Sequence, residues 1–236
     1  MITQAMQWIA DLRRPEIIED KKGHEYLINS EYSSIKESLT PGFKTNSLSS
    51  IVDYIENNFD SVTHKFVIHI EDHETVKLYS AAFGPHKQRE CFVTAKAETP
   101  EFTFGRYYDQ ETFVVSMLSK FKESDGRDYV MGIASNIVED EEVKMIDNGL
   151  SQTAMFKQGV AAIGNEKITP YVKMIPYRTF IEIDQPASIF LLRLRKGGNL
   201  ALYEADGGAW KNEAVSFICN YFNTHLEEVD KFSIMA

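Results

Sequence analysis

The chain has 236 residues, of which 43% are hydrophobic and 25% are charged. This balance excludes a disordered chain, and 13 Gly with 7 Pro exclude a collagen-like or low-complexity one. The formal net charge is −10, which argues against duplex DNA as a partner of the whole surface because phosphate binding needs a positive field. A local basic groove is still compatible with that charge.

Two further features indicate the compartment. Cys91 and Cys219 lie in separate apolar runs and are typical of free thiols in a reducing environment. No apolar run approaches the ~20 residues that span a bilayer, and the first residues lack the basic and apolar regions of a signal peptide. We therefore expect a cytoplasmic protein without a membrane partner.

Residues 1–46 form a charged lead-in, and we expect residues 47–236 to form a single domain. Ser47 is a suitable N-cap for the first helix, in which apolar residues recur at helical spacing as far as Phe59. Asn58 is a suitable stop for it. Alternating polar and apolar residues then predict three strands, of which the first two form a hairpin: 64–70, 75–80 and 91–97.

Two helices are predicted in the middle of the chain. Asp109 is expected to cap the first, in which apolar side chains recur at every fourth residue, and Asp128 is expected to cap the second. Gly126 lies between them and shortens the turn, so the two helices are predicted to form an αα-hairpin. The acidic run 139–142 follows and is typical of a solvated surface.

From residue 150 onward the apolar period changes to two, which is typical of strands. The pair Gly197-Gly198 predicts a tight turn, and residues 209–228 predict a C-terminal helix that is too apolar to stand alone. The predicted strands are 150–161, 167–175, 178–183, 188–196 and 200–204. This order predicts an α+β fold with a mainly antiparallel sheet and packed helices, including the αα-hairpin and the C-terminal helix.

The junction between the last strand and the last helix is the most distinctive local feature. Its candidate binding residues are Glu204, Asp206, Gly207, Gly208 and Trp210. A helix N-terminus presents free N–H groups that bind anions, but the spacing matches no phosphate-binding loop and Asp206 would repel a phosphate. The favoured interpretation is structural: Asp206 caps the helix, the glycines form the turn and Trp210 fills the core.

Arg178 is a second candidate binding residue. On an extended strand Arg178, Phe180 and Glu182 share one face, so Arg178 is predicted to pair with Glu182. An arginine positioned by a carboxylate is also able to bind a phosphate or a partner's carboxylate. Structural pairing is the favoured interpretation.

A groove for single-stranded nucleic acid is a third candidate. Arg193, Arg195 and Lys196 supply cations, and nearby tyrosines supply rings on which bases stack. These tyrosines are Tyr171, Tyr177 and Tyr203. The same residues equally describe the solvent-facing side of a sheet, and the net charge of −10 favours this second interpretation.

Metal and catalytic signatures are weak. His69, Glu71 and His73 would share one side of a continuous strand, but the predicted hairpin places His73 in the turn and the spacing matches no zinc site. Glu142-Val-Lys144 fits a tripeptide of Mg²⁺-dependent nucleases, but it lies in the acidic run. No nucleophile motif is present. We expect no metal, no cofactor and no catalytic residue, and the balance leans against an enzyme.

A set of short phrases is specific when taken together. They are Asp109-Gln110-Glu111-x-Phe113, Asp147-Asn-Gly-Leu-Ser-Gln152, Pro176-Tyr-Arg-Thr-Phe180, Gln185-Pro186-Ala-Ser188 and Leu202-Tyr-Glu-Ala-Asp-Gly-Gly-Ala-Trp210. Together they resemble the YfdQ-like family of phage and prophage proteins, a domain of unknown function, over about residues 48–236. The resemblance implies a phage-encoded protein in the cytoplasm of the bacterial host, encoded near DNA-metabolism or recombination genes. It transfers no catalytic residue.

Two functional hypotheses follow. The first is a non-enzymatic phage accessory protein, forming a homo-oligomer, that contacts a phage or host protein or nucleic acid in DNA metabolism or recombination. The second is a nucleotide- or nucleic-acid-binding enzyme, or an anti-defence protein that sequesters a nucleotide signal. Its site would lie at the junction 204–210, with Arg178 binding the anion.

Overall fold

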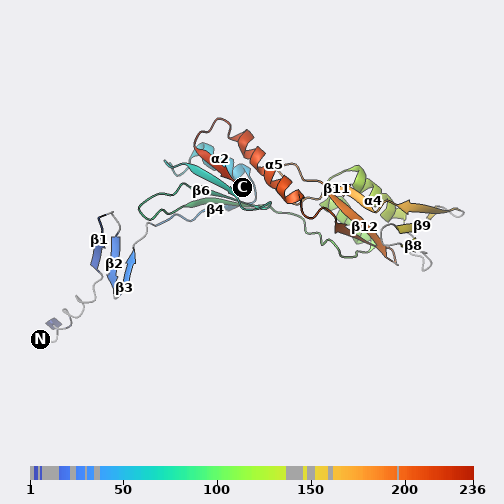
Figure 1. The fold of residues 1–236 in the computed structure, drawn as a ribbon, viewed down its shortest axis with the longest axis horizontal. Helices are drawn as coiled ribbons and strands as arrows, with labels where there is room; N and C mark the ends of the chain where they lie inside the picture. Colours follow the sequence, from blue (N-terminus) through green and yellow to red (C-terminus); the bar gives the residue numbers. More distant parts are fainter. Residues whose placement is uncertain are drawn as a thin grey trace.

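The computed structural model has an α+β fold whose sheets lie one after another along a long axis, with the C-terminal α5 returning beside α2 (Figure 1). Near the N-terminus an antiparallel sheet is formed by β1 (Glu16–Glu19), β2 (Glu25–Asn29) and β3 (Glu31–Ser34). The described residues are 3–4, 6, 16–21, 25–29, 31–34, 38–136, 146–147, 152–158, 162–195 and 197–236.

The larger sheet has five strands in the order β14-β5-β6-β7-β4. Its centre is the predicted hairpin with the strand after it, so these three predictions are confirmed. The two edge strands run parallel to their neighbours, and β4 lies inside the segment predicted as a lead-in. The bounds are β4 Phe43–Thr45, β5 Phe66–Ile70, β6 Thr75–Ser80, β7 Cys91–Lys96 and β14 Phe232–Met235.

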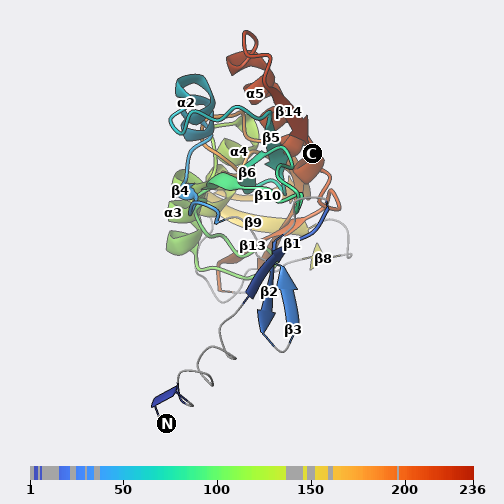
Figure 2. The ribbon, with the colours of Figure 1, turned by 90° about the vertical axis from the view of Figure 1, so that its left-hand side faces the viewer.

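Helices α2 (Ser49–Asn57) and α5 (Trp210–His225) share one hydrophobic core with the larger sheet. Figures 1 and 2 both show the two helices on the same side of its strands. The buried side of α5 carries Ala214, Ile218 and Phe222, spaced by one helical turn. The predicted C-terminal helix is therefore confirmed, and its apolar side is buried on the sheet.

The ends of α2 are fixed by one distant and one local contact. The carboxylate of Glu182 accepts hydrogen bonds from the N–H of Leu48 at 2.7 Å and of Ser49 at 2.9 Å, groups that a helix start leaves free. The predicted cap at Ser47 is wrong: the N-cap is Leu48, and Ser47 Oγ accepts only a long backbone hydrogen bond, from the N–H of Ser50 at 3.4 Å. Asn58, the predicted stop, has a left-handed backbone with a φ of 44° and ends the helix.

A smaller antiparallel sheet is covered on one face by two helices, which form a second hydrophobic core with it. The predicted αα-hairpin is confirmed, and so is the cap at Asp109, whose Oδ1 accepts a hydrogen bond from the N–H of Thr112 at 2.9 Å. The bounds are α3 Gln110–Lys120, α4 Asp125–Asn136, β11 Tyr171–Met174, β12 Ser188–Arg195 and β13 Asn199–Glu204.

The start of α4 differs from the prediction. The helix begins at Asp125, so Asp128 lies within its first turn and is not its cap. Gly126 is also inside the helix and not in the connecting turn. A Cβ at Gly126 would lie 2.0 Å from the carbonyl oxygen of Lys173, so only glycine lets α4 approach β11 this closely.

Three more strands complete the described structure: β8 (Ile146–Asp147), β9 (Gln152–Gln158) and β10 (Ala162–Ile168). They pair antiparallel in the order β10-β9-β8. The predicted strand 167–175 is divided between the end of β10 and β11. Gly197 and Gly198 have φ values of 80° and 72°, which confirms the predicted tight turn before β13.

The predicted strand at 178–183 is wrong. The side chain of Gln185 holds this segment: its Oε1 accepts from the N–H of Arg178 at 2.9 Å, and its Nε2 donates to the carbonyl of Phe180 at 2.9 Å. Phe180 is buried in the core of the larger sheet. Side-chain anchoring therefore replaces the ladder of a strand, and the segment connects the two helix-covered sheets.

The fold class is confirmed, because helices pack on strands whose pairing is mainly antiparallel. The strands of the described residues are distributed over four separate sheets. Within the described part of the chain, no helix is both long and apolar enough to cross a membrane.

Candidate functional site

Arg178 is buried, with 8% of its surface exposed, and is held on several sides. Its Nη1 donates to Glu204 Oε1 at 2.7 Å, its Nη2 donates to Ser188 Oγ, and its guanidinium carbon lies 3.8 Å from the centre of the Trp210 ring. The predicted pairing with Glu182 is wrong, because the two residues do not share a strand. Glu182 caps α2 instead.

Arg178, Glu204 and Trp210 line one pocket of about 300 Å³, which we call the Arg178 pocket. Its walls come from both helix-covered sheets, and they include side chains that were not predicted from the sequence to lie near Arg178. Among the lining residues are His73, Glu74, Glu101, Phe102, Lys120, Tyr177 and Lys211. Thr179 Oγ1 donates to the carbonyl of His73 at 2.5 Å across 106 residues of sequence, a separation at which sequence periodicity carries no signal.

Burial dominates the electrostatics of this pocket. It lowers the pKa of Arg178 to about 10, against the opposing effects of Glu204 and Asp206, so Arg178 stays charged at neutral pH. Burial also lowers the pKa of His73 below 6.5, although Glu74 opposes the shift. The neutral His73 ring meets the Trp210 ring edge-on, with 4.6 Å between the ring centres.

The junction 204–210 has a structural role that differs in part from the prediction. Asp206 Oδ1 accepts from the N–H of Gly208 at 3.1 Å within the turn, whereas α5 begins at Trp210 without a side-chain cap, so the predicted capping role is wrong. Gly207 and Gly208 have φ values of 63° and 80°, which confirms that they form the turn. Of the five predicted junction residues, only Glu204 and Trp210 line the pocket.

Arg193 and Arg195 lie on the other side of the smaller sheet. On β12 they alternate with the buried Leu192 and Leu194, so they project away from α3 and α4. Tyrosines from β11, β13 and the segment before α3 share this side. We call this surface the tyrosine–arginine face: Tyr107, Tyr171, Arg193, Arg195 and Tyr203.

Two of these tyrosines lie in register across the sheet. Tyr171 pairs with Leu191 and Leu191 with Tyr203, which places the two tyrosines two strand spacings apart, about 9.5 Å. Tyr171 is 52% exposed. Tyr177, which was predicted to join them, lines the Arg178 pocket instead, and Lys196 lies outside the described residues.

Tyr107 was not predicted from the sequence to belong to this face. Backbone hydrogen bonds of its segment bring it there. The segment that carries it runs along β13, where the N–H of Gly105 donates to the carbonyl of Leu202 at 2.7 Å. Burial raises the pKa of Tyr107, and a hydrogen bond with Tyr203 adds to the shift. The guanidinium carbon of Arg195 lies 5.7 Å from the centre of the Tyr107 ring.

The strand residues on this side of the smaller sheet include no acidic side chain. They are Tyr171, Lys173, Ile189, Leu191, Arg193, Arg195, Asn199, Ala201 and Tyr203. Three of them are cationic in a chain whose formal net charge is −10. Positive charge is therefore concentrated beside exposed aromatic rings.

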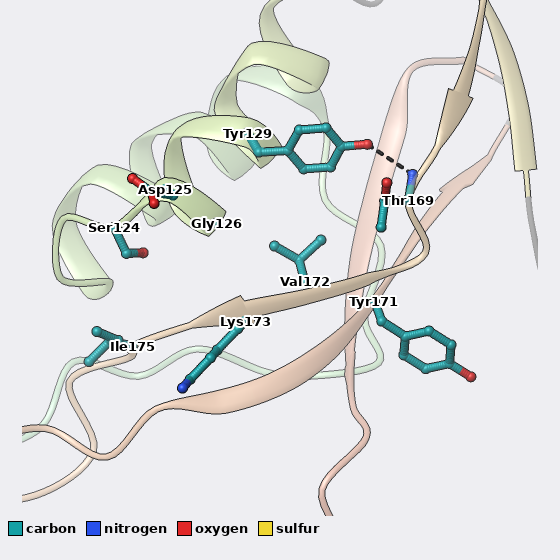
Figure 3. Close-up of a pocket in the computed structure, with 9 residues that line it drawn as sticks. All are labelled: Ser124, Asp125, Gly126, Tyr129, Thr169, Tyr171, Val172, Lys173 and Ile175. Atoms are coloured by element: carbon teal, nitrogen blue, oxygen red, sulfur yellow. Dashed lines mark hydrogen bonds between the residues drawn. The ribbon is translucent and has the colours of Figure 1, made fainter.

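The tyrosine–arginine face continues at the edge of β11 into a second pocket, of about 440 Å³. Figure 3 shows Val172 directed toward α4 and the ring of Tyr171 directed away from that helix. The hydroxyl of Tyr129 accepts a hydrogen bond from the N–H of Thr169 at 2.9 Å and closes one end (Figure 3). Tyr171 belongs to both surfaces, and Lys173 lines this pocket from the same side of β11 as Tyr171.

The remaining candidates form no site within the described residues. His69 lies on β5 and His73 in the turn after it, and no group of three or more His, Cys, Asp and Glu side chains there could hold a metal ion. Glu142-Val-Lys144 and the acidic run lie outside the described residues. Cys91 and Cys219 are free thiols.

Comparisons with protein-family models, with curated proteins and with solved structures found no significant match. The resemblance to the YfdQ-like family therefore stays a prediction. The geometry of the two surfaces carries the functional argument.

Proposed function

We propose that this protein binds single-stranded nucleic acid through the tyrosine–arginine face. The observation that carries the proposal is the composition of this face: exposed tyrosines and cations occur together there, and its strands present no carboxylate. A single strand offers both matching groups, because its phosphates attract arginine and its unpaired bases stack on aromatic rings.

The spacing of the rings favours an open strand over a duplex. Tyr171 and Tyr203 lie about 9.5 Å apart on a sheet surface, so each ring can receive a separate base of an extended strand. Bases inside a duplex are stacked on one another and offer no free face. Arg193 and Arg195 occupy alternate positions of the strand between the two tyrosines, where they can follow the phosphates.

The resemblance stated above supports a wider context for this activity. In that context the protein is a non-enzymatic phage accessory protein that acts as a homo-oligomer in the cytoplasm of the bacterial host. Its nucleic-acid contacts would serve phage DNA metabolism or recombination.

The proposal is tested by replacing the two arginines with glutamine, R193Q with R195Q, and measuring fluorescence anisotropy of a labelled single-stranded oligonucleotide. We expect the affinity at low salt to fall by at least ~10-fold, because two contacts to phosphates are lost. Each lost contact also lowers the slope of log affinity against log salt by ~0.7. The matched control is K44Q with K96Q, which removes two exposed cations from the larger sheet. An equal loss in both double variants would contradict the assignment to this face.

A further inference from the structure

We propose that the Arg178 pocket binds a nucleoside monophosphate, and that the carboxylate of Glu204 occupies the phosphate position in the free protein. This site is separate from the tyrosine–arginine face, because Arg178 and Glu204 lie at the other side of the smaller sheet. The proposal goes beyond strand binding and concerns a small ligand.

Arg178 has the properties of a prepared anion-binding group. The ring of Trp210 on one side, the ring of Phe190 at 5.6 Å and the hydroxyl of Ser188 fix its orientation. Its Nε is buried without a hydrogen-bond partner, and so is Nε1 of Trp210. Buried donors are normally paired, so two unpaired ones beside a pocket point to acceptors that a ligand supplies.

Glu204 is the partner that can leave. Its side chain is 37% exposed, against 9% for that of Arg178, and it stands at the end of β13 beside the turn of Gly207 and Gly208. The carboxylate of Glu204 can rotate into solvent, where it is fully hydrated. The buried side chain of Arg178 cannot move out with it. A phosphate carries more acceptor oxygens than a carboxylate, so one oxygen can accept from Nη1 in place of Glu204 while the others face the lysines of the pocket.

The rest of the pocket matches the other parts of such a ligand. Lys120 and Lys211 provide two more cations, and Phe102 and Tyr177 provide aromatic walls for a base. Lys120 Nζ is held by the carbonyl of Glu101 at 2.6 Å, and it lies 5.9 Å from the centre of the Phe102 ring. A volume of about 300 Å³ lies at the lower end of the range for small-molecule sites, which suits one nucleotide.

The test measures binding of adenosine, guanosine, cytidine and uridine monophosphates by titration calorimetry to the wild-type chain and to E204Q. The amide of E204Q can still accept a hydrogen bond from Arg178, so the fold is retained, while the competing charge is removed. We expect at least one monophosphate to bind E204Q ~10-fold more tightly than the wild type, which corresponds to 1.4 kcal/mol. A purely structural ion pair predicts weaker or unchanged binding, and that result would overturn the proposal.

Further variants separate this site from the tyrosine–arginine face. K120Q with K211Q should weaken monophosphate binding, whereas R193Q with R195Q should leave it unchanged. The matching nucleoside without phosphate should not bind, and inorganic phosphate alone should bind more weakly than the nucleotide. Absence of binding to both wild type and E204Q at millimolar ligand, or equal binding of inorganic phosphate, would contradict the assignment of a nucleotide.

Discussion

Arg178 keeps its charge in surroundings that oppose it. Burial lowers its pKa to about 10, and the cost of removing a guanidinium from water is offset by Glu204, by Ser188 and by the face of the Trp210 ring. The sequence predicted that Arg178 would pair with Glu182, whereas the structure pairs it with Glu204. Sequence periodicity does not identify Glu204 as the partner, because the segment 178–185 turns. This turn brings Arg178 to Glu204 and Glu182 to the start of α2.

His73, in the Arg178 pocket, makes the stability of the protein depend on pH below 6.5. Because burial lowers its pKa in the folded chain, the unfolded chain binds a proton first as the pH falls below 6.5. The contribution of His73 to stability is therefore complete above pH 6.5 and decreases as the pH falls toward its lower folded pKa. We expect H73Q to lose less stability than the wild type between pH 7 and pH 5, as measured by urea unfolding.

The neighbouring carboxylate provides the control for this prediction. Glu74 raises the pKa of His73, with its Oε1 3.8 Å from the His73 Nε2, so E74Q should lower that pKa further. The loss of stability at acid pH should then be larger than in the wild type. If H73Q and wild type have parallel pH profiles, half-buried His73 is not the source of the dependence.

At the scale of elements, helix α4 depends on a single glycine. A Cβ at Gly126 would lie 2.0 Å from the backbone oxygen of Lys173, whereas Gly132 in the same helix has no atom within 4 Å of the added position. The backbone oxygen of Lys173 cannot shift as the end of a flexible side chain can. A Cβ at Gly126 would therefore force α4 to move away from β11.

These two glycines form a matched pair for a stability measurement. We expect G126A to destabilise the protein by about 2 kcal/mol or more, because a clash with backbone outweighs the gain in helix propensity. G132A should stabilise the protein by up to ~1 kcal/mol, since it gains propensity and meets nothing. Chemical denaturation of both variants would show opposite signs, and a stabilised G126A would disprove the close contact.

The elements that sequence periodicity predicted are those stabilised by local pattern. The stop of helix α2 at Asn58, the hairpin of β5 and β6, and the Asp109 cap all follow from neighbours in sequence. The failures depend on distant contacts. The segment 178–183 alternates like a strand, yet Gln185 and the core position of Phe180 hold it as a turn.

The two candidate surfaces were predictable to different extents for the same reason. Alternation along β12 and β13 places Arg193, Arg195 and Tyr203 on one side from sequence alone. Tyr107 joins them only because its segment runs along β13. The Arg178 pocket collects residues from segments far apart in the chain, so sequence indicated its charged centre but not its walls.

At the scale of the whole molecule, charge is distributed unevenly. The chain carries a formal charge of −10, yet one side of the smaller sheet presents two arginines, a lysine and exposed tyrosines without a carboxylate on its strands. The net repulsion of a polyanion by the whole chain weakens long-range attraction. Contact is then expected to depend strongly on salt and to be confined to this face.

Competition between strand forms tests most directly whether the tyrosine–arginine face receives an open strand. A labelled single-stranded oligonucleotide bound to the protein is displaced with the same sequence, unlabelled, as single strand or as duplex. We predict that the single strand competes at least ~10-fold better than the duplex, and that Y171A, but not Y171F, loses most of this preference because stacking contributes ~1–3 kcal/mol per base. Equal competition by the two forms, or a preference unchanged in Y171A, would contradict the account.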